Sequence, residues 1–201
     1  SHAEGFGTNA FGNASHSEGY ETGATGYASH TEGMYTIAGG TGSHAEGINT
    51  NANGEASHAE GYLTGATGYS SHAEGYETWA AGDVSHTDGT YTQAYGEASH
   101  AEGVLSGATG CASHSEGIYT LASGVASHAE GSYTYAYGRH SHAEGETTEA
   151  QGDNSHAGGM EAIATQHGQW ARSGGYFTTG EMAQTSIFHL RVKDDAGSTG
   201  Y

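Results

Sequence analysis

The stretch SHAEGYLTGATGYS, residues 57–70, is followed directly by SHAEGYETWAAGDV, residues 71–84, and the two differ only at positions 7, 9, 11, 13 and 14. The same unit, which begins Ser-His-(Ala/Ser/Thr)-(Glu/Asp)-Gly, starts every 14 residues from Ser1 to Ser141, and a decayed copy starts at Ser155. Position 10 of the unit is alanine in all twelve copies, from Ala10 to Ala164. A strict period of this length is typical of a solenoid, in which each repeat forms one coil and stacks on its neighbours.

Each unit predicts one coil with two strands of about five residues and two tight turns. Frequent glycine and the alternating pattern argue against helix. Alternation directs positions 1, 3 and 5 (Ser, Ala, Gly) and positions 8, 10 and 12 (Thr, Ala, Gly) inward, and positions 2 and 4 (His, Glu) outward. We therefore expect two closely spaced sheets around a thin core that buries little apolar area.

Composition alone would suggest disorder, because the formal net charge is −19 and large aliphatic residues are scarce, but the unbroken repeat argues for order. Only four basic residues oppose 23 acidic ones, so neither nucleic acid nor an anionic membrane is expected as a partner. Proline is absent and glycine does not recur at every third position, which excludes a collagen helix. Cys111 is the one cysteine, so no disulfide framework is expected.

The His and Glu columns at positions 2 and 4 are nearly invariant along the chain, apart from Asp88 and Gly158, whereas position 9 varies as solvent-facing positions do. This constancy predicts a second uniform environment, which other copies of the same chain around a shared axis would supply. The residues expected at that axis are His16, Glu18, His30, Glu32, His44, Glu46, His58, Glu60, His72, Glu74, His86, Asp88, His100, Glu102, His114, Glu116, His128, Glu130, His142 and Glu144.

Buried polar side chains persist only when they are hydrogen-bonded, so we expect these imidazoles and carboxylates to bond within and between chains. A neighbouring carboxylate is expected to favour the charged imidazole and so to raise the pKa of His. Two alternatives stay open: an ordinary exposed strand face, and a divalent ion held on the axis by rings of His and Glu. Apart from such axial ions, no cofactor is expected.

The unit S-H-A-E-G-x-x-T-x-A-x-G-x-A resembles the head repeat of YadA-like trimeric autotransporter adhesins, S-V-A-I-G-x-x-S-x-A-x-G-x-x, position for position. The SHAEG version is similar to repeats in phage tail fibres and in proteins that end in an autoproteolytic peptidase domain. The resemblance covers residues 1 to about 166. It implies a left-handed parallel β-roll, three of which associate side by side. Where the family has Val and Ile toward the trimer centre, this chain has His and Glu, as at His58 and Glu60.

Other activities fit the pattern less well. Ser and His of the motif are predicted on opposite sides of a strand, and a catalytic site is not repeated a dozen times, so no enzyme is expected. The Thr column is predicted to point inward, which argues against ice binding. Sugar stacking is an alternative for outward aromatic residues in coils six to ten, which are otherwise ordinary strand-surface residues; the candidates are Trp79, Tyr95, Tyr135 and Tyr137.

The chain divides into a twelve-coil solenoid over residues 1–166, a capping or transition segment over residues 167–193, and a linker over residues 194–201. Trp170, Tyr176 and Phe177 are suitable covers for the last coil. Gly174-Gly175 predicts a turn, and the alternation from Gln184 to Lys193 predicts an amphipathic strand. The run from Gln169 to Lys193 resembles a segment that follows such repeats in tailed-phage fibres.

Repeat and resemblance together predict an all-β homotrimeric solenoid with a small C-terminal β cap and, at ~4.8 Å per coil, roughly 55 to 60 Å of shaft. The expected function is structural: the shaft of a bacteriophage tail fibre or receptor-binding protein that serves host attachment, on the virion. The alternative is the head of a trimeric adhesin on a bacterial cell surface. The expected partners are two further copies, the rest of the fibre, and a host glycan or protein met by a tip outside this chain.

Overall fold

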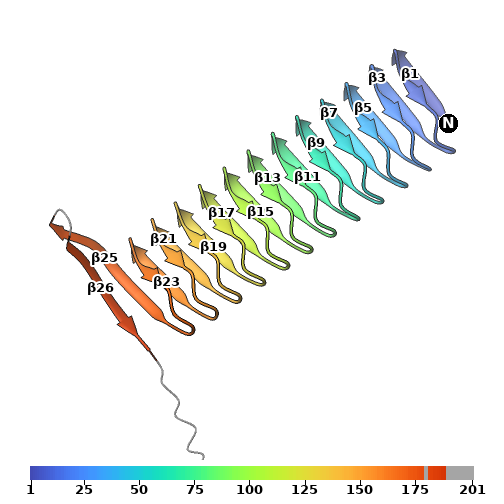
Figure 1. The fold of residues 1–201 in the computed structure, drawn as a ribbon. Coiled ribbons are helices and arrows are strands. Elements are labelled where there is room, and N and C mark those ends of the chain that lie inside the picture. Colours follow the sequence, from blue (N-terminus) through green and yellow to red (C-terminus); the bar gives the residue numbers. More distant parts are fainter. Residues whose placement is uncertain (179–180, 189–201) are drawn as a thin grey trace, which may run out of the picture.

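The computed structural model describes residues 1–178 and 181–188, and the regular structure in them is entirely β. The chain winds into a straight stack of coils, with a long sheet along one side and a short-stranded sheet along the other (Figure 1). No helix in this part of the chain is long and apolar enough to cross a membrane. The prediction of an all-β solenoid is confirmed.

Within the described residues, the long sheet contains fourteen strands and the other sheet contains twelve. The strands of the long sheet are β1 (His2–Phe6), β3 (His16–Tyr20), β5 (His30–Met34), β7 (His44–Ile48), β9 (His58–Tyr62), β11 (His72–Tyr76), β13 (His86–Thr90), β15 (His100–Val104), β17 (His114–Ile118), β19 (His128–Ser132), β21 (His142–Glu146), β23 (His156–Met160), β25 (Trp170–Thr178) and β26 (Glu181–Ile187). The strands of the short sheet are β2 (Asn9–Ala10), β4 (Gly23–Ala24), β6 (Ile37–Ala38), β8 (Asn51–Ala52), β10 (Gly65–Ala66), β12 (Trp79–Ala80), β14 (Gln93–Ala94), β16 (Gly107–Ala108), β18 (Leu121–Ala122), β20 (Tyr135–Ala136), β22 (Glu149–Ala150) and β24 (Ile163–Ala164).

Neighbouring coils pair in parallel and in register, so each residue lies beside its equivalent 14 positions further on. His58 pairs with His72 and Glu60 with Glu74 in the long sheet, and Ala66 pairs with Ala80 in the short sheet. The predicted 14-residue coil is therefore confirmed, with about twelve turns of parallel solenoid.

The second strand of each coil has two residues, so the prediction of about five was wrong. Two turns with a left-handed residue limit it: Leu63 has φ 56° before β10, and Ser70 has φ 50° after it. Hydrogen bonds nevertheless continue from coil to coil beyond the strand, from Leu63 N to Ile48 O (3.0 Å) and from Thr67 N to Ala80 O (2.9 Å). The turns therefore stack as regularly as the strands.

The core is as small as predicted. Ala59, Thr64 and Ala66 are completely buried, as are their equivalents in most coils. Ser57 is also buried, and its hydroxyl donates to Gly54 O at 2.7 Å across the turn between coils. The Ser column therefore closes turns, while Ala and Thr fill the space between the sheets.

The two glycine columns are required by contact between coils. A Cβ on Gly61, at position 5, would overlap the carbonyl oxygen of Gly75, and one on Gly82, at position 12, would overlap that of Gly96. The alternation predicts position 5 inside the core, and this prediction is wrong. Gly61 is exposed and has φ 111°.

The end of the stack extends the long sheet by two strands. β25 pairs in parallel with β23, and β26 pairs antiparallel with β25. The turn predicted at Gly174-Gly175 is wrong, because β25 continues through both residues with a register shift between Ser173 and Tyr176. Of the strand predicted from Gln184, β26 covers residues up to Ile187; residues 189–193, the predicted linker over 194–201, and the side chains of Tyr176 and Phe177 lie outside the described parts.

Two glycine substitutions test whether glycine is needed at position 12 because the next coil lies in contact there. We expect Gly82→Ala to lower the free energy of unfolding by about 3 kcal/mol, because the new methyl group overlaps backbone of the next coil. Gly23→Ala is the control, since a Cβ there meets nothing within 4 Å, and should change stability by about 1 kcal/mol or less. Guanidinium unfolding measures both variants, and equal effects would contradict the role of the column.

A second pair of variants tests the core hydroxyls. Thr22 Oγ1 bonds Ser17 Oγ at 2.8 Å and Glu18 O at 3.2 Å, whereas the buried Oγ1 of Thr64 has no partner. We expect Thr22→Val to cost about 1 kcal/mol of unfolding free energy and Thr64→Val to be neutral or stabilising. The same unfolding measurement checks this, and a larger loss for Thr64→Val than for Thr22→Val would refute it.

Candidate functional site

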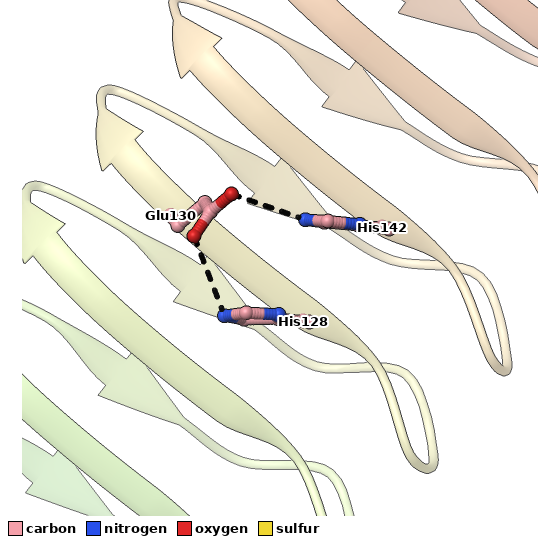
Figure 2. Close-up of side chains that lie close together, drawn as sticks. All are labelled: His128, Glu130 and His142. Atoms are coloured by element: carbon pink, nitrogen blue, oxygen red, sulfur yellow. Dashed lines mark ion pairs between the residues drawn. The ribbon is translucent and has the colours of Figure 1, made fainter.

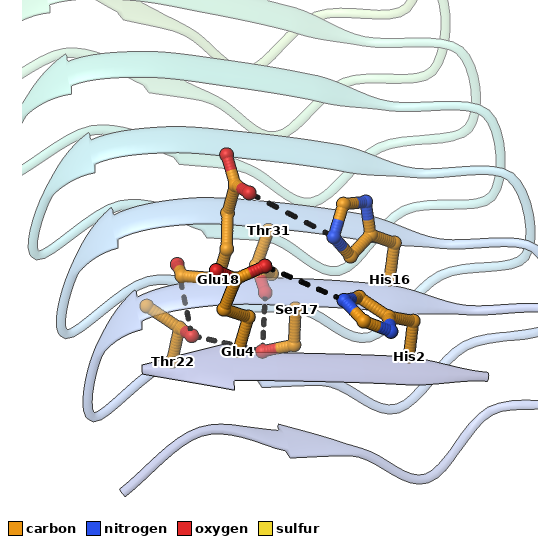
Figure 3. A network of polar contacts seen from close by, with 7 residues as sticks. All are labelled: His2, Glu4, His16, Ser17, Glu18, Thr22 and Thr31. Atoms are coloured by element: carbon orange, nitrogen blue, oxygen red, sulfur yellow. Dashed lines mark hydrogen bonds and ion pairs between the residues drawn. The ribbon is translucent and has the colours of Figure 1, made fainter. Parts of the chain in front are cut away.

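The most regular surface is the outer side of the long sheet, where the His and Glu side chains of positions 2 and 4 project; we call it the His–Glu face. Figure 3 shows it at the N-terminal end, where His2, Glu4, His16 and Glu18 pair on the surface. From the second coil on, the small residue between His and Glu (Ala, Ser or Thr) is buried, so strand alternation holds both side chains outward. The predicted columns are therefore present along the sheet.

The imidazoles form one stacked column. Consecutive ring centroids from His2 to His156 are 4.7 to 5.1 Å apart, which follows from the spacing of paired strands. Most rings lie nearly parallel, whereas the end pair His142–His156 is edge-on at 74°. Trp170 then continues the column at 5.0 Å from His156.

The carboxylates lie beside the imidazole Nε2 atoms. Within a coil the closest Nε2–Oε2 distance is 3.3 Å, between His72 and Glu74. Further along, Glu130 lies between two coils, with Oε2 4.0 Å from His128 Nε2 and Oε1 3.5 Å from His142 Nε2 (Figure 2). A carboxylate can therefore lie near the imidazole of its own coil, near that of the next coil, or near both.

Most of these imidazoles have an Nε2 atom that is shielded from solvent and lacks a hydrogen-bond partner within the chain. The residues are His16, His30, His44, His58, His72, His86, His100, His114, His128 and His142. Buried polar atoms are normally satisfied. The face therefore has capacity to bind another group.

The electrostatic effect on His is the opposite of the prediction. Burial, followed by the neighbouring imidazoles, lowers the pKa of His30, His58, His100 and His128. The adjacent carboxylates oppose this shift but do not overcome it. The expected charged pairs are thus wrong for these four residues, because burial, and then the neighbouring imidazoles, disfavour the charged ring more than the carboxylates favour it.

Two residues at the C-terminal end continue the columns: Trp170, which the sequence predicted only as a cover for the last coil, and Arg172, which sequence reasoning missed. Trp170 pairs with His156, and Arg172 pairs with Gly158 at the end of the Glu column. Arg172 lines a shallow groove with Glu130 and Glu144, so one cation lies at the end of a row of carboxylates. Counting 14 residues onward from His156 and Gly158 would have identified both.

An exposed apolar strip borders the carboxylates at position 6 and was also missed. Tyr20, Met34, Ile48 and Tyr62 each expose about two fifths of their surface, and the rings of Tyr62 and Tyr76 stack at 5.2 Å. Extended apolar surface of this kind marks interaction sites. The signal in the sequence is the repeated apolar residue six positions into the unit.

The aromatic candidates for sugar stacking lie on the opposite side, in two pairs. Trp79 covers Gly65 and shares a shallow hollow with Tyr95, while Tyr135 and Tyr137 lie nearly parallel with ring centroids 5.9 Å apart. Trp79, Tyr95 and Tyr137 are exposed and Tyr135 is half-buried. The structure therefore joins these residues in pairs and not in one continuous platform.

Comparison with known proteins adds no family assignment: no protein-family model matches the chain, and no curated protein matches it. The function is therefore inferred from the fold and from the surfaces described above.

The pH dependence of stability tests the neutral His column. Because folding lowers the pKa of His58, the stability from its neutral form is full above its unfolded pKa of about 6.5 and is lost as the pH falls through that value toward the folded pKa. We expect the melting temperature to fall between about pH 8 and pH 5 in chelator and about 0.5 M salt, which screens repulsion among the acidic residues.

Two matched variants test this. His58→Gln should reduce the fall in melting temperature on acidification, whereas His140→Gln, in an exposed turn outside the column, should leave it as in the wild type. A melting temperature that rises on acidification equally in all three proteins would contradict the pKa direction.

Proposed function

We propose that this chain is a segment of a fibrous shaft built by three copies of itself, and that the shaft belongs to a bacteriophage tail fibre or receptor-binding protein that mediates host attachment. The observation that supports it best is the uninterrupted His–Glu face with its adjoining apolar strip. In this proposal three left-handed coil stacks lie side by side, and their His–Glu faces meet near a common axis on the virion.

The fold suits a rigid spacer. Each coil hydrogen-bonds to the next through strands and turns alike, so the stack has no hinge-like loop in its repeats. At ~4.8 Å per coil the repeats span roughly 55 to 60 Å. Such a shaft holds a recognition element at a fixed distance, which is a mechanical task and needs no catalytic group.

The periodicity of the face favours copies of the same chain as partners. Imidazoles repeat with the spacing of one coil from His2 to His156 and carboxylates from Glu4 to Glu144, and the apolar residues at position 6 follow the same spacing except at Thr90, Ser132 and Glu146. A partner can match every coil only if its groups have the same spacing, which a second identical stack has. Closed rings of identical subunits are the usual form of such assemblies, and the threefold order follows from the resemblance to trimeric adhesins.

The final strands support a role in ending the shaft. β26 runs antiparallel along β25, and Trp170 and Arg172 replace His and Glu at the ends of the columns. We propose that this region caps the stack and that host recognition by protein or glycan lies in a tip outside the described residues.

A bacterial surface adhesin head is the second candidate, and one observation favours it. The pairs Trp79–Tyr95 and Tyr135–Tyr137, all exposed except the half-buried Tyr135, lie on the face opposite the proposed axis, where a head that binds directly would meet glycans. A glycan array that shows binding lost in Trp79→Ala would favour the adhesin, whereas genes for tail and baseplate proteins beside this one would favour the fibre.

The assembly is tested by mass and by a matched pair of variants. We expect light scattering to give the mass of three chains. Ile48→Lys, which puts a charge on the apolar strip, should weaken association about tenfold or more. Ile37→Lys on the short sheet is the control, because Ile37 is similarly exposed at 45% against 40% for Ile48. A monomer at all concentrations would rule out the assembly.

A further inference from the structure

The His–Glu face contains clusters of metal-ligating atoms within a single chain. In the part of the chain that the structure describes, three triads bring one donor atom from each residue within 4.8 Å of the others: His128–Glu130–His142, Glu18–His30–Glu32 and Glu102–His114–Glu116. The first is the richest in nitrogen, and Figure 2 shows Glu130 between the two rings, with β19 and β21 supplying all three residues. These ligands come from adjacent coils and require no second chain.

The separations suit one ion after a small adjustment. Donor atoms on a tetrahedral zinc lie about 3.3 Å apart, because zinc–nitrogen and zinc–oxygen bonds are about 2.0 to 2.1 Å. Glu130 Oε1 is 3.5 Å from His142 Nε2, and Glu130 Oε2 is 4.0 Å from His128 Nε2. These two distances reach different carboxylate oxygens, and one donor atom of each of the three residues lies within 4.8 Å of the other two, so the donors would move closer together by up to about 1.5 Å to share one ion.

The imidazole nitrogens are free to serve as ligands. Nε2 of His128 and of His142 is shielded from solvent and has no hydrogen-bond partner in the chain, although each side chain is about one-third exposed. An ion would thus fill a position that the fold leaves open, with water as the fourth ligand.

We propose that His128, Glu130 and His142 form a transition-metal site that binds Zn²⁺ and links the coils of β19 and β21. Two imidazoles and one carboxylate are a donor set that zinc accepts, whereas Mg²⁺ and Ca²⁺ prefer oxygen ligands. The other two triads carry one imidazole and two carboxylates and are weaker sites of the same kind. This inference goes beyond the shaft function and does not depend on the number of chains.

Equilibrium dialysis of the chelator-stripped protein against Zn²⁺ tests the proposal, with the protein used both as purified and after refolding in Zn²⁺ so that assembly cannot block access. We expect the wild-type chain to bind zinc. Glu130→Gln and the double variant His128→Gln/His142→Gln should each bind one ion fewer per chain, or bind that ion at least about tenfold more weakly. His140→Gln should bind as the wild type does, and Mg²⁺ should not compete.

Two further measurements separate loss of the site from loss of the fold or the assembly. Circular dichroism and light scattering should show that Glu130→Gln, which keeps the side-chain shape, has the fold and mass of the wild type. Anomalous diffraction at the zinc edge should place a peak between Glu130 and both rings. Equal zinc binding by wild type and both site variants, or no zinc binding by the wild type in either preparation, would overturn the proposal, whatever the mass.

Discussion

Direct contact between the backbones of successive coils is the constraint on which the rest of the structure depends. Glycine at positions 5 and 12 leaves room for the neighbouring carbonyl oxygen, as at Gly61 and Gly82. Since the core contains little beyond Ala, Thr and Ser, hydrophobic burial per coil is small. Stability therefore rests on the repeated hydrogen bonds between coils, which involve turns as well as strands.

In-register stacking places every side chain beside its own equivalent, and this creates the chemistry of the His–Glu face. Burial disfavours a charged imidazole, and so does repulsion from the neighbouring rings, so both lower the pKa of residues such as His58. Carboxylates between coils, as at Glu130, lie near two Nε2 atoms at once. The same arrangement offers a surface that matches identical chains and, at its nitrogen-rich triad, a place for a metal ion.

The period and the identity of the inward columns could be predicted from the sequence because they depend on spacing alone. The length of the second strand could not, because Leu63 and its equivalents adopt left-handed φ without being glycine and so give no signal. The pKa direction was mistaken because desolvation and like neighbours outweigh the carboxylates, a balance that needs burial to be known. Which carboxylate of a metal triad reaches which ring depends on side-chain conformation and could not be predicted. The places of Trp170 and Arg172 at the ends of the His and Glu columns were predictable from the 14-residue period.

Amide hydrogen exchange of residues in the turns tests coil stacking most directly. Ala56 and Leu63 are exposed turn residues, yet their amides donate to Thr41 O (2.8 Å) and Ile48 O (3.0 Å) of the preceding coil. The account predicts protection within about tenfold of the strand amide of His58, which donates to Ser71 O (2.9 Å). Exchange of Ala56 and Leu63 at the rate of an unstructured chain, while His58 stays protected, would contradict it.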